Sequence, residues 1–385
     1  MAGRRDNGAG YIFKRQDGKG WRGRIAEGRN SDGKVKYKYF SGKTEAEVKK
    51  KIREYQRSGD MELERKTVTV GKYVTNWLHT YKKVTLKPSS YDRLENTVKH
   101  QIIPHIGDIQ LQALSSDDIQ EMITDLKAEG KSYSTIKKAY DCMSAVLKHA
   151  VIADDIVKNP MLLVQMPEKK VFEQHEVRAF TKEETLAIVE EACRTYSTGK
   201  PIYANGDAFI LMLNTGLRIG ELSALRRSDW DEEAQELHVR QTAVKVKKRD
   251  EDGEAAGGYT LASNTTKTYS GDRIIPLNKT ATDALQRIVQ KRPKSEMLFS
   301  DTDKPVDPHN LQKSFYALLA NVGIEKTGIH ALRHTFASFL FAKGVDVKTV
   351  SKILGHANIQ ITLNTYVHMI KDADKNAVKQ LDEIY

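Results

Sequence analysis

The residues of this sequence best suited to chemistry are arginines, histidines and a tyrosine in its carboxy-terminal half. His330 and Arg333 belong to the stretch His-Ala-Leu-Arg-His-Thr, so both side chains project from one face of a helix. A guanidinium binds two oxygens of a phosphate at once, and an imidazole exchanges a proton near neutral pH. The pair therefore suits a phosphodiester, although a buried histidine beside an ion-paired arginine would show the same spacing.

A second arginine lies in surroundings that are typical of a phosphate site. Arg218 stands between Gly216 and Gly220, after an apolar stretch and ahead of a helix expected over residues 221–225. Backbone N–H groups at a helix start bind anions, and a guanidinium beside them adds charge and hydrogen bonds. A surface arginine after a glycine turn would also fit this motif.

Three further residues complete the set of candidates. Lys267 lies near the tip of an expected hairpin, His356 follows Gly355, and Tyr366 comes shortly afterwards. The histidines show neither metal-ligand spacing nor a Ser/His/Asp arrangement, and no acidic cluster could hold Mg²⁺. Together these residues predict phosphate chemistry carried out by the protein's own cations, without a metal or another cofactor.

Helices are expected to position most of these residues. The segment 177–385 opens with a capping-box pattern at 181–184 and is predicted to be mainly helical, apart from short strands around a polar loop within 236–277. A charged linker is expected over 167–176, and the segment 67–166 before it shows apolar residues at helical spacing throughout. We therefore expect a mainly α domain with a small antiparallel sheet, preceded by an all-α bundle of four or five helices.

The amino-terminal segment, residues 1–62, is expected to be a small α+β domain that binds DNA. Aromatic and basic residues alternate between Asp-Gly turns, which predicts a three-stranded antiparallel sheet followed by a lysine-rich helix. The first 66 residues hold 19 lysines and arginines against 10 aspartates and glutamates, so most of the net charge of +11 lies here. Basic side chains on one face of such a sheet could lie in a DNA groove, but a solubilising sheet would show the same pattern. The candidate DNA-binding residues are Arg22, Arg24, Lys36 and Lys38.

Composition argues against several other classes of protein. Hydrophobic residues make up 39% and charged residues 29% of the chain, as in ordinary globular proteins. No apolar run is long enough to span a bilayer, and the basic start of the chain lacks the apolar stretch of a signal peptide. Cys142 and Cys193 lie far apart and are expected to be free, buried thiols. These features predict a cytoplasmic, nucleoid-associated protein without a membrane partner.

One ordered set of residues resembles the tyrosine recombinase (phage integrase) family. That set is Arg218, Lys267, His330, Arg333, Gly355, His356 and Tyr366. The resemblance spans essentially the whole chain and is greatest to integrases of conjugative transposons and prophages of Gram-positive bacteria. It implies the tyrosine recombinase fold, with an arm-type DNA-binding domain over 1–62, a core-binding domain over 67–166 and a catalytic domain over 177–385.

The resemblance implies a role for each cationic residue of the set. Arg218 and Arg333 would clamp the scissile phosphate and stabilise the charge of the pentacoordinate transition state. Lys267 would act as general acid toward the 5′-hydroxyl leaving group. The nearby rivals for this last role are Lys245, Lys247 and Lys248.

It also implies that Tyr366 is the nucleophile, which would form a covalent bond to a DNA 3′-phosphate. His330 would assist proton transfer at Tyr366, His356 would hydrogen-bond the phosphate, and Glu221 would support the site. A phenol with a pKa near 10 is a poor nucleophile, so it needs cations beside it. The phosphotyrosyl ester would keep the energy of the broken bond, so rejoining would need no ATP.

By the same resemblance, the protein would be an integrase of a mobile element, active in transposition or viral genome integration and in excision. Its partner would be double-stranded DNA attachment sites, on which a homotetramer exchanges strands through a Holliday junction. An excisionase and a host DNA-bending protein are compatible with this activity. Apolar residues after Tyr366 are expected to dock on a neighbouring subunit, or else to cap their own core.

Three alternatives remain open on the sequence. A chromosome-dimer-resolving recombinase would typically lack the basic sheet domain. A type IB topoisomerase shares the chemistry, but the close spacing of His330 and Tyr366 and the helical bundle fit it less well. A non-catalytic DNA-binding regulator would have a decayed site, whereas all six catalytic positions hold suitable residues.

Overall fold

The structure, a computed structural model, covers two compact units. It describes residues 11–15, 20–29, 35–57, 68–172, 178–250, 253, 255–265, 272–363 and 365–366. One unit comprises residues 1–86 and 93–172, and the other comprises residues 87–92 and 173–385.

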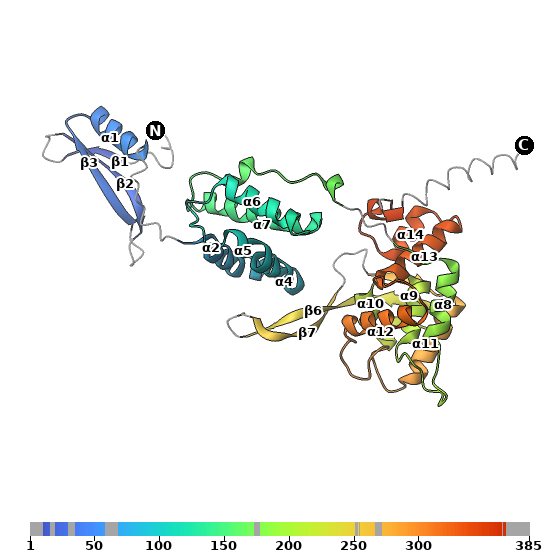
Figure 1. The fold of residues 1–385 in the computed structure, drawn as a ribbon. Coiled ribbons are helices and arrows are strands. Elements are labelled where there is room, and N and C mark those ends of the chain that lie inside the picture. The colour runs from blue at the N-terminus through green and yellow to red at the C-terminus, as the bar shows by residue number, and fades with distance from the viewer. Residues whose placement is uncertain are drawn as a thin grey trace, which may run out of the picture. The chain divides into compact units, whose positions relative to one another are not determined.

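The described residues between 11 and 57 form a three-stranded antiparallel sheet with one helix packed on it, as expected (Figure 1). Its elements are β1 (Tyr11–Lys14), β2 (Trp21–Arg29), β3 (Val35–Gly42) and α1 (Glu45–Arg57), with β2 in the middle of the sheet. The small core between sheet and helix contains Ile25, Val48 and Ile52. Gly23 allows the helix to approach, because a Cβ there would lie 2.7 Å from Val48 and 2.8 Å from Ile52.

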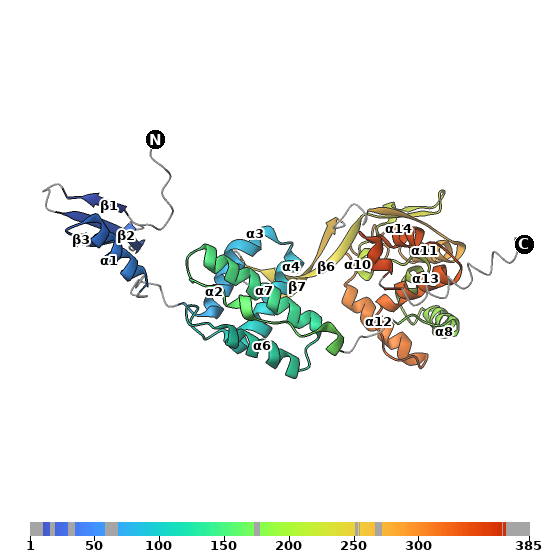
Figure 2. The ribbon, with the colours of Figure 1, turned by 90° about the horizontal axis from the view of Figure 1, so that it is seen from above.

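Residues 68–163 are mainly helical, as their apolar spacing predicts (Figure 2). The α-helices are α2 (Val70–Trp77), α3 (Lys83–Thr85), α4 (Pro88–Thr97), α5 (Ile103–Ile106), α6 (Ser116–Ala128) and α7 (Tyr133–Ile152), with π-helical turns at Leu78–Lys82 and Val98–Ile102. Ser115 caps α6, because its side chain accepts a hydrogen bond from the backbone N–H of Asp118. Helix α7 is capped by Ser132, whose side chain accepts a hydrogen bond from the backbone N–H of Thr135.

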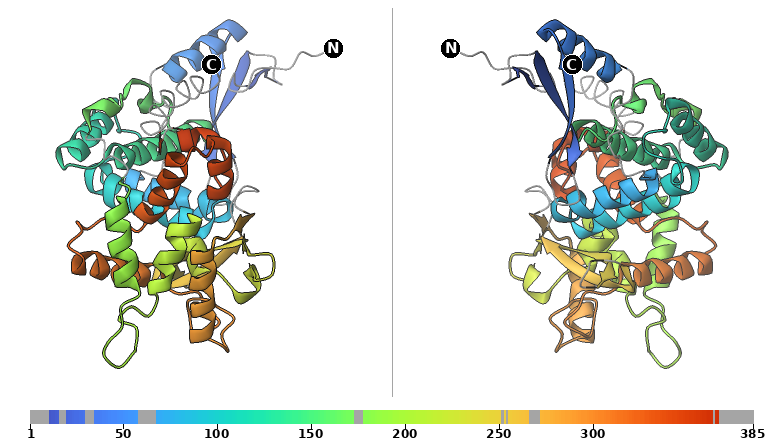
Figure 3. Two further views of the ribbon diagram at one scale, coloured as in Figure 1. Left: turned by 90° about the vertical axis from the view of Figure 1, so that its right-hand side faces the viewer. Right: turned by 90° about the vertical axis from the view of Figure 1, so that its left-hand side faces the viewer.

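The second unit combines helices with two small antiparallel sheets (Figure 3). Its α-helices are α8 (Lys182–Ala192), α9 (Gly206–Thr215), α10 (Ile219–Ser223), α11 (Lys279–Lys291), α12 (Pro308–Asn321), α13 (His330–Ala342) and α14 (Val347–Leu354). The sheets are β4 (Trp230–Asp231), β5 (Glu236–Val239) and β8 (Arg273–Pro276), and the hairpin of β6 (Gln241–Arg249) with β7 (Ala255–Thr265).

Helix α9 lies at the centre of this unit and contacts α8, α11 and α13. Its sequence is apolar on all sides, which is typical of a helix surrounded by protein. Phe209 of α9 and Phe315 of α12 are both fully buried, with ring centroids 5.2 Å apart. The turn after α9 is therefore anchored in the core, and it carries the first candidate arginine.

Two expectations need correction. The region 236–277 was expected to hold only short strands around a polar loop, but Lys247 pairs with Tyr259 in the longer hairpin of β6 and β7. Cys142 is buried as expected, whereas Cys193 is exposed, and both are free thiols.

None of the helices in the described residues is long and apolar enough to cross a membrane.

Candidate active site

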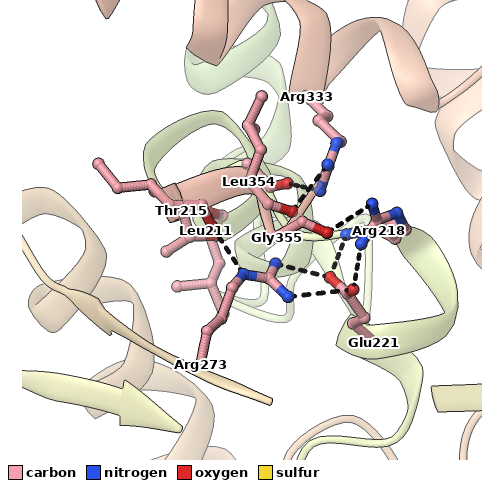
Figure 4. A network of polar contacts seen from close by, with 10 residues as sticks. Leu211, Thr215, Arg218, Glu221, Arg273, Arg333, Leu354 and Gly355 are labelled. Atoms are coloured by element: carbon pink, nitrogen blue, oxygen red, sulfur yellow. Dashed lines mark hydrogen bonds and ion pairs between the residues drawn. The ribbon is translucent and has the colours of Figure 1, made fainter. Parts of the chain in front are cut away.

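Three arginines from separate parts of the chain converge on the carboxy-terminal end of α14 (Figure 4). Arg273 Nε donates to the carbonyl of Ile353 over 2.7 Å, and Arg333 Nη2 donates to that of Leu354 over 2.8 Å. Arg218 Nη2 donates to the carbonyl of Gly355, which follows Leu354, over 3.2 Å. The last carbonyls of a helix lack intrahelical partners and carry its negative dipole end, which favours cationic donors. The structure thus brings Arg218 and Arg333 together, as the sequence predicted.

Two glycines allow this convergence. Gly216 ends α9 with φ +64°, and a Cβ there would lie 2.5 Å from Phe336 and 2.8 Å from Leu354. Its carbonyl accepts a second hydrogen bond from Arg333, through Nη1 over 2.7 Å. Gly355 ends α14 with φ +68°, a left-handed conformation that favours glycine. The chain therefore reverses direction at both points, with carbonyls presented to the guanidinium groups.

Glu221 lies between two of the arginines. It accepts hydrogen bonds from the backbone N–H and Nη1 of Arg218 over 2.9 and 2.7 Å, and from Nη1 and Nη2 of Arg273 over 3.2 and 2.9 Å. Burial alone would raise the pKa of this carboxyl, but the hydrogen bond and charge of Arg273, together with Arg218, lower it to about 2. Glu221 is therefore a carboxylate that fixes both guanidinium groups, which agrees with its expected supporting role.

Arg273 is a residue that the sequence reasoning did not assign to the site. Its side chain is buried, and it links β8 both to Glu221 and to the end of α14. A signal for this was available in the sequence. Side chains alternate along a strand, so Arg273 shares the buried side of β8 with Ile275. An arginine on the buried side of a strand needs a buried acidic or carbonyl partner for its charge.

Replacing Arg273 with methionine is expected to lower the free energy of unfolding by about 3 kcal/mol, because breaking a buried ion pair leaves Glu221 with one guanidinium partner. Urea unfolding measures the change. The matched control is Arg240→Gln, since Arg240 is half exposed and lies 3.9 Å from its nearest carboxylate oxygen. A pair this long, with a half-exposed guanidinium, contributes about 0–1 kcal/mol. Equal losses in the two variants would contradict the positioning role of Arg273.

Two of the histidines border the arginine cluster. His330 forms the first turn of α13 and is exposed, while His356 follows the α14 end and is partly buried. His356 Nδ1 lies 2.7 Å from the hydroxyl of Thr362, which is fully buried. Burial, and then the charges of Arg333, Arg218 and Arg273, lower the pKa of His356 to about 4. It is therefore neutral at physiological pH and suited to hydrogen bonding.

Tyr366 lies in the same unit as the arginines, with only 4% of its surface exposed. Its ring packs against Phe341 of α13, with ring centroids 5.3 Å apart. Its hydroxyl lies 2.8 Å from Nδ1 of His334, another residue that the sequence reasoning did not assign. Burial raises the pKa of Tyr366 to about 12, against the opposing effect of the Arg333 charge. The phenol is thus protonated in this state.

The candidate general acid, Lys267, lies outside the described residues. Of its rivals, Lys245 is held by an ion pair, with Nζ 3.0 Å from Oδ2 of Asp307 and 5.3 Å from the centroid of the Tyr259 ring. Lys247 and Lys248 lie further along the same strand, β6.

The basic candidates of the amino-terminal sheet divide between its two faces. Arg22 and Arg24 lie on the open face, where Arg22 is 4.7 Å from the ring centroid of Tyr39 and Arg24 is 4.6 Å from that of Tyr37. Lys38 pairs with Ile25 and therefore faces α1, with its Nζ 4.0 Å from the ring centroid of Tyr55. The expectation that Lys38 shares a face with the arginines is wrong. The side chain of Lys36 lies outside the described part of the structure.

Across the described residues, no three or more His, Cys, Asp or Glu side chains are grouped so as to hold a metal ion.

Comparison with known proteins identifies the family. The chain matches the phage integrase family over residues 178–372 and the phage integrase N-terminal SAM-like domain over residues 69–127. It is 30% identical to a protein named "tyrosine recombinase XerC-like" from Caldanaerobacter subterraneus subsp. tengcongensis, over 94% of this chain and 95% of that protein. It is 26% identical to the "transposase from transposon Tn916" of Enterococcus faecalis, over 72% of this chain and 69% of that protein.

Solved structures show the same fold. The Tn1549 transposon integrase in complex with transposon right end DNA has a TM-score of 0.66 and 25% identity, and covers 82% of this chain and 100% of its own. A lambda integrase dimer bound to a COC′ core site has a TM-score of 0.58 and 16% identity, and covers 94% of this chain and 96% of its own. The chain therefore belongs to the phage integrase family of tyrosine recombinases, and its expected fold is confirmed. It is an enzyme of site-specific DNA recombination, which cuts and rejoins DNA strands.

Proposed function

We propose that this recombinase integrates a mobile genetic element into DNA and excises it again, with Tyr366 as the nucleophile. The observation that carries the proposal is the convergence of Arg218 and Arg333 on one end of α14, with His356 next to it and Tyr366 in the same unit. Glu221 neutralises only part of the positive charge of these guanidinium groups, so they can still bind a phosphate placed against them. Tyr366 would attack the phosphorus and form a phosphotyrosyl ester that stays attached to the DNA 3′-oxygen, while the bond to the 5′-oxygen breaks and a 5′-hydroxyl leaves.

The other residues have roles that fit their surroundings. Arg218 and Arg333 stabilise the charge that develops on the phosphate oxygens, and His356 hydrogen-bonds one of those oxygens. His330 is exposed at the start of α13, where a DNA phosphate can reach it. Lys267 protonates the leaving 5′-oxygen, a role that rests on the resemblance to the family. Because the reaction needs only these side chains, we propose that no cofactor takes part.

Relatives of two kinds bear on which DNA this recombinase acts on, a mobile element or the host chromosome. The Tn916 relative and the fold of the Tn1549 integrase support a mobile element, as does the amino-terminal sheet domain. The XerC-like relative, which matches 94% of this chain, favours a second candidate, a recombinase that acts on the host chromosome. The two differ in substrate. An integrase joins two different attachment sites, whereas a chromosome-dimer recombinase joins two copies of one site.

We further propose that four copies act together on paired double-stranded attachment sites, through a Holliday junction, in the nucleoid of the cytoplasm. A lambda integrase tetramer bound to a Holliday junction shares the fold, with a TM-score of 0.57 and 16% identity. An excisionase and a host DNA-bending protein would set the direction of the reaction. The domain boundaries at 1–62, 67–166 and 177–385, with a linker at 167–176, belong to the same proposal.

The test of the activity is a nicked duplex that carries the element's core site. Cleavage next to the nick releases a short fragment by diffusion, so the enzyme stays trapped on the DNA. We expect a covalent adduct that survives denaturing electrophoresis and forms in EDTA without ATP. A protein that only binds DNA would shift the duplex in a native gel and would trap nothing.

The open face of the amino-terminal sheet is proposed to hold arm-type DNA. Arg22 and Arg24 lie there among tyrosines, a combination that suits a phosphate backbone. Replacing both with alanine should reduce the slope of log Kd against log salt by about 2, since each phosphate contact contributes roughly 0.9. The matched control is the double variant Lys49→Ala and Arg53→Ala on α1, behind the sheet. Equal slopes for the arginine variant and the wild type would contradict the assignment.

A further inference from the structure

Helix α13 carries two histidines, and the second of them, His334, contacts Tyr366. His334 directly follows Arg333, and its Nδ1 lies 2.8 Å from the Tyr366 hydroxyl, with the two rings 5.9 Å apart between centroids. His330 lies one helical turn earlier, and its ring centroid is 6.5 Å from that of His334. In the described part of the chain, the histidine that hydrogen-bonds to the Tyr366 hydroxyl is therefore His334.

The tyrosine ring sits on one face of α13. His334, Ala337 and Phe341 follow the spacing i, i+3, i+7, which places their side chains on the same face of the helix. Ala337 is fully buried in the same cluster as Tyr366, and Phe341 packs on the tyrosine ring. Ala337 and Phe341 fix the plane of the ring, while His334 fixes the position of its hydroxyl.

The chemistry of the pair suits a hydrogen bond between neutral groups. Burial, and then the charges of His330 and Arg333, lower the pKa of His334 to about 4, while burial raises the pKa of Tyr366 to about 12. A neutral imidazole with its proton on Nε2 accepts the phenol O–H through Nδ1. The lone pairs of the phenol oxygen then remain available to an electrophile.

The sequence position of His334 couples this contact to the phosphate site. Arg333 points from α13 to Gly216 and Leu354, and the next side chain holds the tyrosine. Any movement of α13 therefore moves the arginine and the phenol together. A nucleophile must be held within a fraction of an ångström of its attack position, since a misplacement of 1 Å can lower a rate about 100-fold.

We infer that His334 is a positioning residue that holds the hydroxyl of Tyr366 for attack, through the hydrogen bond to its Nδ1. This inference rests on the proposed role of Tyr366 as nucleophile. His334 acts through the tyrosine and needs no contact with the phosphate. It differs in this from His330 and His356, which border the arginine cluster.

The test compares His334→Leu and His334→Asn with the wild type in single-turnover cleavage of the nicked core-site duplex, using the full chain at saturating DNA. Leucine keeps the bulk and removes the acceptor, so we expect cleavage to slow about 100-fold with an unchanged Kd for DNA. Asparagine places an amide oxygen near the position of Nδ1, so we expect it to restore the rate to within about tenfold of the wild type. The matched control is His309→Asn, because His309 is exposed on α12.

A second substrate separates positioning of the nucleophile from help to the leaving group. A bridging sulfur at the scissile 5′ position makes a leaving group that needs no proton, so it should not restore the His334→Leu rate. The inference is overturned if the leucine variant cleaves at the wild-type rate, if asparagine is as slow as leucine, or if the sulfur substrate restores the rate. An adduct that forms in the wild type on a residue other than Tyr366 overturns the proposed nucleophile, and this inference with it.

Discussion

Replacing Tyr366 with phenylalanine is expected to abolish the covalent adduct while leaving the fold and DNA binding intact. The substitution removes one oxygen, and the aromatic ring still packs against Phe341 and Ala337. The change in the free energy of unfolding should be about 1 kcal/mol, the usual contribution of one hydrogen bond, here that to His334. The loss of activity should instead be complete, because no covalent intermediate can form without its nucleophile.

The measurement is adduct formation on the nicked core-site duplex, alongside native-gel binding and thermal unfolding. The matched control is Tyr196→Phe, a tyrosine that is 55% exposed in the same unit. Tyr196→Phe should form the adduct at the wild-type rate. An adduct that persists in Tyr366→Phe would show that another residue attacks the phosphate. Peptide mass spectrometry of the trapped wild-type complex identifies that residue directly.

The elements around the site could be predicted because local patterns determine them. Ser115 and Thr181 mark helix starts through capping boxes, and both caps are present. The spacing of His330 and Arg333 requires a helix to bring them to one face, and α13 begins at His330. Such features depend on residues within one or two turns of each other. The sequence alone contains what is needed to predict them.

The faces of the amino-terminal sheet could not be predicted in the same way. Lys36 and Lys38 alternate with Tyr37 and Tyr39, so the lysines share a side of β3 wherever its pairing is regular. Whether that side is also the side of Arg24 depends on the register between two strands, and a shift by one residue reverses the answer. In the structure Arg24 pairs with Tyr39, which puts the tyrosine, and not the lysine, beside the arginine.

The arginine cluster shows a second kind of limit. Nothing local to Arg218, Arg273 or Arg333 indicates that their partners are three consecutive carbonyls at the end of α14. These contacts join residues 21 to 137 positions apart, and they exist only because the core packs α9 and α13 against each other. The resemblance to a family supplied the residues of the set, whereas Arg273 and His334 emerged from the tertiary contacts.

Substitution of Arg333 by lysine is expected to slow cleavage about 1000-fold, the upper range for loss of one preorganised donor to a transition-state oxyanion. Arg333 is 3% exposed, and two of its N–H groups already bind the carbonyls of Gly216 and Leu354. Its remaining donors can face a phosphate while the backbone contacts persist. Lysine has one nitrogen and cannot serve both carbonyls and a phosphate in fixed directions.

Electrostatics also makes this position sensitive. Arg218 and Arg273 both pair with Glu221, and Arg333 adds a third guanidinium at the end of α14, so the site holds more positive charge than Glu221 neutralises. Burial, and then the charge of Arg218, lower the pKa of Arg333. A phosphate relieves that repulsion, and its binding should therefore couple the two arginines. We expect the double variant Arg218→Lys and Arg333→Lys to be hardly slower than Arg333→Lys, because residues that act as a unit are not additive. Single-turnover rates below the unfolding temperature of each variant measure this, with Arg240→Lys as the control. Multiplicative losses, or a rate for Arg333→Lys within tenfold of the wild type, would mean that the two guanidinium groups do not share one phosphate.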